Sequence, residues 1–64
     1  MKNNIKRLRT QLNITQAELS ILTDIPIDEL DAIESDQVEP SLIDAHKITK
    51  ALNQDFIASV FELD

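Results

Sequence analysis

The residues with the clearest chemical potential are carboxylates that recur at helical spacing in the middle of the chain. Asp28, Asp31 and Glu34 stand three residues apart, so a helix would carry all three on one face. Paired carboxylates can act as general acid and base, but this chemistry needs a cleft that shifts their pKa values. A chain of 64 residues buries too little surface to build a deep cleft. The carboxylates therefore do not predict an enzyme or any catalytic residue.

Composition also argues against metal, cofactor and membrane chemistry. The chain has no Cys and a single histidine, His46, so it offers neither a thiolate site nor a histidine cluster for a metal ion. It has no Gly, which phosphate-binding and calcium-binding loops require. No apolar run approaches the roughly 18 residues of a membrane-spanning helix, and no signal peptide is evident. We expect a cytoplasmic protein with no metal, no cofactor and no membrane contact.

Charge is distributed unevenly along the sequence, which has a net charge of −6. The basic residues are confined to two short stretches: Lys2, Lys6, Arg7, Arg9, Lys47 and Lys50. The acidic residues between Thr10 and His46 are Glu18, Asp24, Asp28, Glu29, Asp31, Glu34, Asp36, Glu39 and Asp44. The middle of the chain is therefore predicted to form an acidic surface.

Residues 15–35 contain two short helical patterns separated by a break. Thr15 followed three residues later by Glu18 is the pattern of a capping box, which satisfies free amides at a helix start. Asp24 stands where a tight turn requires a left-handed residue, and Asp tolerates that conformation. Pro26 cannot continue the first helix but suits the start of the second. The stretch is predicted to fold as helix, turn and helix.

Apolar residues at helical spacing predict further helices on both sides of this unit. Ile5, Leu8 and Leu12 mark a first helix that ends near Asn13. A later helix, capped by Ser41, has the apolar positions Leu42, Ala45, Ile48, Ala51 and Leu52. Asp55 then precedes a last short helix with Phe56, Ile57, Val60, Phe61 and Leu63. The predicted fold is all-α, a single domain over residues 1–64 that packs as a compact bundle of about five short helices.

Four segments together carry a resemblance to a known family. They read I-K-R-L-R, then T-Q-A-E-L, then I-E near the end of the third helix, then P-S-L-x-x-A-x-K-I-x-K-A-L. In this order and register they resemble the helix-turn-helix domain of the lambda repressor and Cro type. The resemblance covers nearly the whole chain and implies the lambda-repressor-like DNA-binding fold.

The resemblance also implies roles for individual residues. Gln16 matches a glutamine that contacts a DNA phosphate and orients the reading helix. Arg9 and Glu34 match a partly buried ion pair that joins the first helix to the third. The positions that would face base edges in the major groove are Ile27, Asp28, Asp31 and Ala32.

The third helix departs from the usual chemistry of DNA recognition. Affinity for duplex DNA comes largely from Lys and Arg, and base reading typically uses Arg, Lys, Asn or Gln, whereas this helix offers several carboxylates. Helical geometry also places Leu22 on the outer side of the second helix. The opposite, inward arc is set by Ala17, Leu19, Ser20 and Thr23. Apolar residues beside an acidic rim are typical of a protein interface.

Two functions therefore remain open. Local electrostatics favour an interaction protein of a phage or mobile-element switch that covers a basic DNA-binding partner such as a repressor, as an anti-repressor would. Its contacts would be Leu22, Ile27, Asp28, Glu29 and Asp31. The alternative is a sequence-specific repressor that binds duplex DNA, with phosphate contacts supplied by the N-terminal basic residues.

The apolar C-terminal segment predicts a second kind of contact. The last helix often forms the two-fold interface in the proteins that this chain resembles. Ile57, Phe61 and Leu63 are accordingly predicted to support a homodimer, although the same residues could instead close the core.

Overall fold

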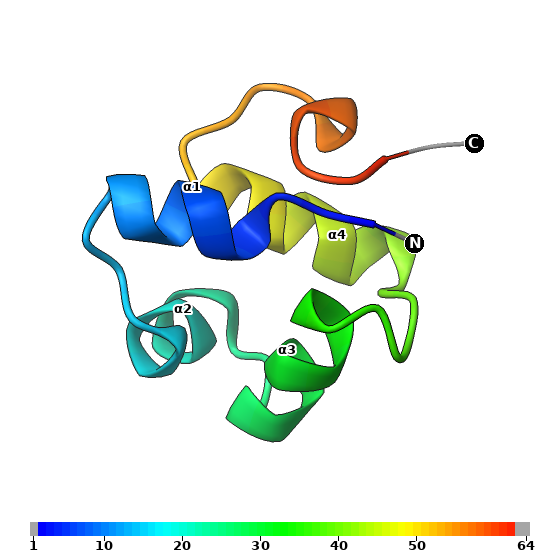
Figure 1. The fold of residues 1–64 in the computed structure, drawn as a ribbon, viewed down its shortest axis with the longest axis horizontal. Coiled ribbons are helices and arrows are strands. Elements are labelled where there is room, and N and C mark those ends of the chain that lie inside the picture. Colours follow the sequence, from blue (N-terminus) through cyan, green and yellow to red (C-terminus); the bar gives the residue numbers. More distant parts are fainter. Residues whose placement is uncertain (1, 63–64) are drawn as a thin grey trace.

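The computed structural model describes residues 2–62, which fold into short helices around one core (Figure 1). The elements are α1 (Ile5–Gln11), α2 (Gln16–Thr23), α3 (Ile27–Glu34), α4 (Leu42–Ala51) and the 3-10 helix η1 (Ile57–Ser59). The all-α prediction is confirmed. The predicted fifth helix is reduced to the single turn of η1, and Phe56 lies outside it in an extended conformation.

The helix starts follow the local capping signals in the sequence. Thr15 and Glu18 form the predicted capping box: the Glu18 amide donates to Thr15 Oγ1, and the Thr15 amide donates to Glu18 Oε1, both at 3.1 Å. At the start of α4, the Asp44 amide donates to Ser41 Oγ at 3.1 Å. Each bond satisfies an amide that the helix itself leaves free.

Thr15→Ala is expected to lower the free energy of unfolding by about 1 kcal/mol, because the side-chain half of the capping box is lost. Thr10→Ala is the matched control, since the Thr10 hydroxyl donates only to the Lys6 carbonyl within α1. Urea denaturation followed by far-ultraviolet circular dichroism compares the two variants. Equal effects of the two substitutions would show that the capping box does not stabilise α2.

The helix ends are set by Asn and Asp residues in the left-handed conformation. Each of the four α-helices is followed by one residue with a positive φ angle: Asn13 (56°), Asp24 (58°), Asp36 (62°) and Asn53 (59°). A chain without glycine must place its most tolerant residues at these positions, and Asn and Asp accept them with little steric cost. The predicted roles of Asn13 and Asp24 are thus confirmed.

The core lies between the helices and collects one or more buried side chains from each of the four α-helices, together with residues from the segments that follow them. Its buried apolar residues are Ile5, Leu8, Leu19, Ile25, Leu30, Ile33, Ala45, Ile48, Leu52, Val60 and Phe61. Four positions differ from the predicted apolar faces, because Leu12 (37%), Ala17, Leu42 and Phe56 (71%) are exposed. Ala17 is exposed, so Leu19 and Thr23 define the inner side of α2. Leu42 is 76% exposed, because burial of α4 begins one turn later, at Ala45.

The two ends of the described chain are joined by backbone hydrogen bonds. The Asn4 amide donates to the Val60 carbonyl and the Glu62 amide to the Lys2 carbonyl, each at 2.8 Å. Asn3 and Phe61 accordingly form an antiparallel bridge, and the two segments lie side by side in Figure 1. This contact draws the C-terminal segment onto the core.

Phe61, one of the three residues predicted to support a homodimer, closes the core instead, which is the alternative that the sequence left open. Phe61 is 2% exposed and belongs to the core of its own chain, so it does not present an apolar face to a second copy. Ile57 is half-buried and packs against the same core. Leu63 lies outside the described residues. The sequence pattern could not separate core from interface because both require apolar side chains at helical spacing.

Candidate nucleic-acid interface

The turn between α2 and α3 is held from inside the protein. Ile25 lies in the turn with its side chain 3% exposed, and its carbonyl accepts a hydrogen bond from the Ser20 hydroxyl. Pro26 is the N-cap of α3, as the sequence predicts. Buried Leu19 on α2 and Leu30 on α3 complete the anchor. The anchored turn fixes the orientation of α3 relative to α2.

The outer side of α3 carries most of the predicted contact residues. Ile27, Asp28, Glu29 and Asp31 are exposed, whereas Ala32 is half-buried. The Asp28 carboxylate accepts from the Glu29 amide at 3.1 Å, so one of its oxygens is engaged locally at the helix start. The other Asp28 oxygen and the Glu29 carboxylate have no hydrogen-bond partner among the described residues, so they are available to solvent or to a ligand.

An ion pair connects the first and third helices. Arg9 donates from Nε and Nη2 to the two carboxylate oxygens of Glu34, at 2.9 Å each, and from Nη1 to the Ile14 carbonyl at 3.1 Å. Both side chains are largely buried, with 12% and 8% exposed. The structure thus contains the pair implied by the resemblance, and it adds a third bond, to the loop before α2, that the sequence did not indicate.

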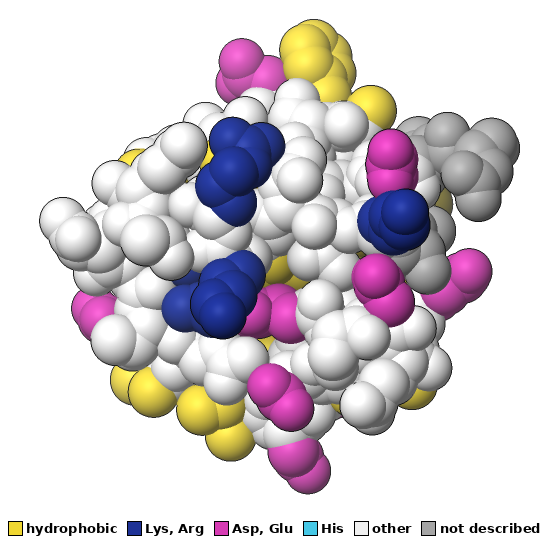
Figure 2. Space-filling view, in the orientation of Figure 1, with side chains coloured by type: hydrophobic (Ala, Val, Ile, Leu, Met, Phe, Trp, Pro, Cys, Tyr) yellow, Lys and Arg dark blue, Asp and Glu magenta, His cyan; other side chains and the backbone are white. Residues whose placement is uncertain are grey.

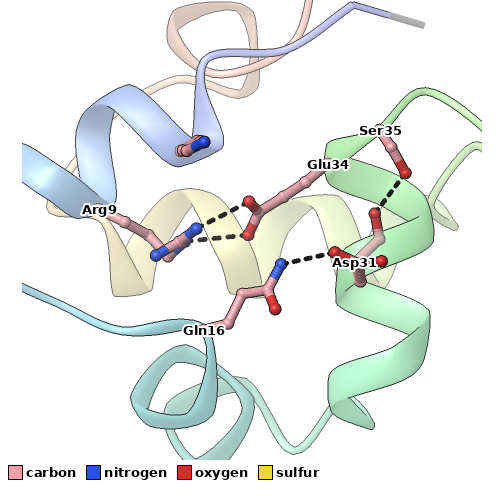
Figure 3. A pocket seen from close by; sticks show the side chains of 6 residues that line it. Arg9, Gln16, Asp31, Glu34 and Ser35 are labelled. Atoms are coloured by element: carbon pink, nitrogen blue, oxygen red, sulfur yellow. Dashed lines mark hydrogen bonds and ion pairs between the residues drawn. The ribbon is translucent and has the colours of Figure 1, made fainter.

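A second contact joins α2 to α3 directly. Gln16 Nε2 donates to Asp31 Oδ1 at 3.1 Å, so a predicted phosphate-contacting residue is bonded to a predicted base-facing one (Figure 3). Sequence reasoning assigned both residues but not the bond. The hollow around this bond is lined by Lys6, Arg9, Gln16, Asp31, Glu34 and Ser35. Three helices therefore contribute polar groups to one surface depression.

Basic and acidic side chains occupy separate parts of the surface that contains this hollow. Figure 2 shows Lys and Arg side chains over α1 and Asp and Glu side chains over α3, on the same face of the molecule. Lys6 lies at the boundary, because it lines both the hollow beside α3 and the neighbouring depression along α1 with Arg7. The surface predicted to be acidic is acidic at α3, but cations stand next to it in space.

The exposed apolar residues Leu22 and Ile27 do not both lie within an acidic rim, contrary to what the sequence suggested. Leu22 is 62% exposed and Ile27 is 46% exposed, in agreement with their predicted outward positions. Leu22 lines a shallow hollow with His46, Lys47, Lys50 and Ala51 of α4 and with Asn53 just after it. Its neighbours in that hollow include two lysines and no acidic residue. The sequence did not indicate this, because Leu22 and the lysines of α4 are far apart in the chain.

One contact at the far end of α3 was not predicted. Asn3 Nδ2 donates to the Ile33 carbonyl at 2.9 Å and to Asp36 Oδ1 at 3.3 Å, and Asn3 Oδ1 accepts from the Ile5 amide at 3.1 Å. Asn3 thus connects the start of α1 to the end of α3. Nothing local in the sequence indicates these bonds, because their partners in α3 and after it lie about thirty residues away.

Comparisons with known proteins agree with this geometry. The family model described as helix-turn-helix, of the Cro/C1 type, matches residues 5–57. The chain is 36% identical over 64 residues to an uncharacterized HTH-type transcriptional regulator of Methanothermobacter thermautotrophicus, covering 100% of this chain and 93% of that protein. The chain belongs to the Cro/C1-type helix-turn-helix family. Of the helices in the described part of the chain, none is long and apolar enough to cross a membrane.

Proposed function

We propose that this protein regulates transcription by binding duplex DNA through α2 and α3. The observation that carries the proposal is the anchored α2–turn–α3 unit, which presents Gln16 and the outer side of α3 on one surface. Membership of a family of transcriptional regulators supports it. Of the two functions left open by the sequence, the comparisons favour this one over an anti-repressor.

Chemical complementarity suggests how each contact would work. Gln16 can donate to a phosphate oxygen, and a carboxylate from Asp28 or Asp31 can accept from the cytosine amino group in the major groove. Ile27 can contact a thymine methyl group. Phosphate neutralisation would come from the exposed cations of α1, which lie next to the acidic helix (Figure 2). A homodimer, with Ile57 still a candidate contact, would read two half-sites about one helical turn apart.

Binding to duplex DNA from the protein's own locus is expected to be measurable at low salt and to weaken steeply as salt rises. Each phosphate that the protein neutralises releases counterions, and this release produces the salt dependence. Fluorescence anisotropy with labelled duplex measures it, and circular dichroism in the same buffer verifies that the protein is folded. A folded protein that shows no binding at low salt would contradict the proposal.

A second candidate function is binding to a basic protein, such as a DNA-binding repressor. It is favoured by one observation: the exposed face of α3 combines Asp28, Glu29 and Asp31 with the exposed apolar residue Ile27, and α3 itself carries no Lys or Arg. Charge would steer the partner, and apolar contacts from Ile27 and Leu22 would add affinity. Both functions use the same surface, so they can be tested with the same variant.

Reversing two charges on α3 is expected to separate these functions. Asp28→Lys combined with Asp31→Lys changes the net charge from −6 to −2, and it should raise nonspecific affinity for duplex DNA by at least about tenfold if α3 faces DNA. The matched control is Asp55→Lys with Glu62→Lys, two exposed acids outside α2 and α3 that produce the same net charge. Anisotropy titrations compare the two variants. Equal gains would argue that α3 does not face DNA, and loss of a basic protein partner would favour the second function.

A further inference from the structure

The hydrogen bond between Gln16 and Asp31 has a functional consequence beyond its place in the fold. We infer that Asp31 lowers the affinity of this protein for duplex DNA by holding the Gln16 amide against a fixed negative charge. Asp31 would thus be a positioning residue that acts through Gln16. The inference rests on the proposed DNA-binding function and identifies what limits it.

The chemistry of the two side chains determines how they are oriented. An ionised carboxylate only accepts hydrogen bonds, so the Gln16 amide must turn its NH₂ group toward Asp31 and its oxygen away (Figure 3). One N–H is then engaged with Asp31 Oδ1 at 3.1 Å. A DNA phosphate, which also only accepts, needs the same NH₂ group. It must either use the second N–H beside the carboxylate or displace Asp31 from the first.

Either route brings a phosphate close to the Asp31 carboxylate, which forms no ion pair among the described residues. The nearest guanidinium cannot compensate it, because Arg9 donates from Nε and Nη2 to Glu34 and from Nη1 to the Ile14 carbonyl. Lys6 is the remaining cation among the residues that line this hollow. Asp31 is exposed, so solvent weakens the repulsion without removing it at contact distances.

The position of the pair makes this effect specific to backbone contacts. Gln16 is the first residue of the eight-residue helix α2, and Asp31 lies in the middle of α3, so the bond spans the two helices that would touch DNA. A contact to phosphate carries no sequence information. Asp31 should therefore reduce affinity for every duplex by a similar factor, rather than select one operator sequence.

The test compares Asp31→Asn with Glu29→Gln in anisotropy titrations against a labelled duplex of mixed sequence at low salt. Both substitutions remove one negative charge from the exposed side of α3, but no hydrogen bond joins Glu29 to Gln16 among the described residues. Asp31→Asn keeps a side-chain oxygen that can accept from Gln16. We expect about a five- to tenfold gain in affinity for Asp31→Asn and about a twofold gain for Glu29→Gln.

A double-mutant cycle shows whether the gain passes through Gln16. In a Gln16→Ala background, Asp31→Asn should give only the twofold gain of Glu29→Gln. Two results would overturn the inference while leaving DNA binding intact. One is an equal gain in affinity for Asp31→Asn and Glu29→Gln in the unaltered background, and the other is a full gain for Asp31→Asn in the Gln16→Ala background. Weaker binding by Asp31→Asn would overturn it as well, and would identify Asp31 as a base-contacting residue. If every folded variant fails to bind, the proposed function falls together with the inference.

Discussion

Phe61→Ala is expected to lower the free energy of unfolding by about 3–5 kcal/mol, the usual cost of removing a large aromatic side chain from a core. Phe61 is 2% exposed and sits among residues from the helices that frame the core. Its backbone also pairs with Asn3, so the side chain secures a segment that closes both ends of the described chain. A domain of this size has a total stability of only about 3–10 kcal/mol. The substitution should therefore remove a large fraction of the total stability of the domain.

Phe56 provides the matched control for this prediction. It is the other phenylalanine of the chain, is 71% exposed, and should change the free energy of unfolding by less than about 0.5 kcal/mol when replaced by alanine. Urea denaturation followed by circular dichroism measures both variants, with Phe61→Leu included because a smaller volume loss should leave a measurable folded population. Similar effects at the two positions would place Phe61 outside the core.

Glu34→Ala is expected to cost about 3 kcal/mol, because it leaves the Arg9 guanidinium largely buried without its carboxylate. The loss arises from an unpaired charge more than from the missing attraction. Replacing both residues together, by Arg9→Met with Glu34→Leu, should therefore be less destabilising than the single change. The exposed acid Glu29 supplies the control substitution Glu29→Ala, with an expected effect within about 0.5 kcal/mol.

The same urea denaturation experiments, repeated at low and at high salt, test the contribution of the ion pair. A buried, bidentate pair should keep most of its contribution when salt is raised, whereas an exposed pair would lose it. This explanation would be contradicted if Glu34→Ala were as stable as the original chain. It would also be contradicted if the double variant were much less stable than Glu34→Ala. The double variant should still lose some free energy of unfolding, because replacing Arg9 removes the hydrogen bond to the Ile14 carbonyl.

The acidic α3 surface explains why function was harder to predict than fold. Fold depends on apolar spacing and helix ends, and these signals extend over most of the chain, as does the family match over residues 5–57. Function depends on the electrostatic surroundings of a few exposed groups. The sequence separates the cations of α1 from the acids of α3, yet Lys6 and Asp31 line the same hollow in the folded protein. An acidic stretch in sequence is therefore not a uniformly acidic surface in space.

The sequence by itself determined the helices and the turns between them. Capping by Thr15 and the left-handed positions of Asn13 and Asp24 depend on neighbours within a few residues, so local chemistry suffices to predict them. The family resemblance supplied the pairing of Arg9 with Glu34, which no local signal indicates.

Only the tertiary structure decided which side chains are buried in the core and which are exposed on the surface. Phe61 is core rather than interface because the Asn3 segment pairs with it, and Leu42 is exposed because the helices that bury α4 cover only its later turns. The bond from Gln16 to Asp31 likewise depends on how α2 packs against α3. Such contacts join residues far apart in sequence, and their geometry exists only once the core has fixed the relative positions of the helices.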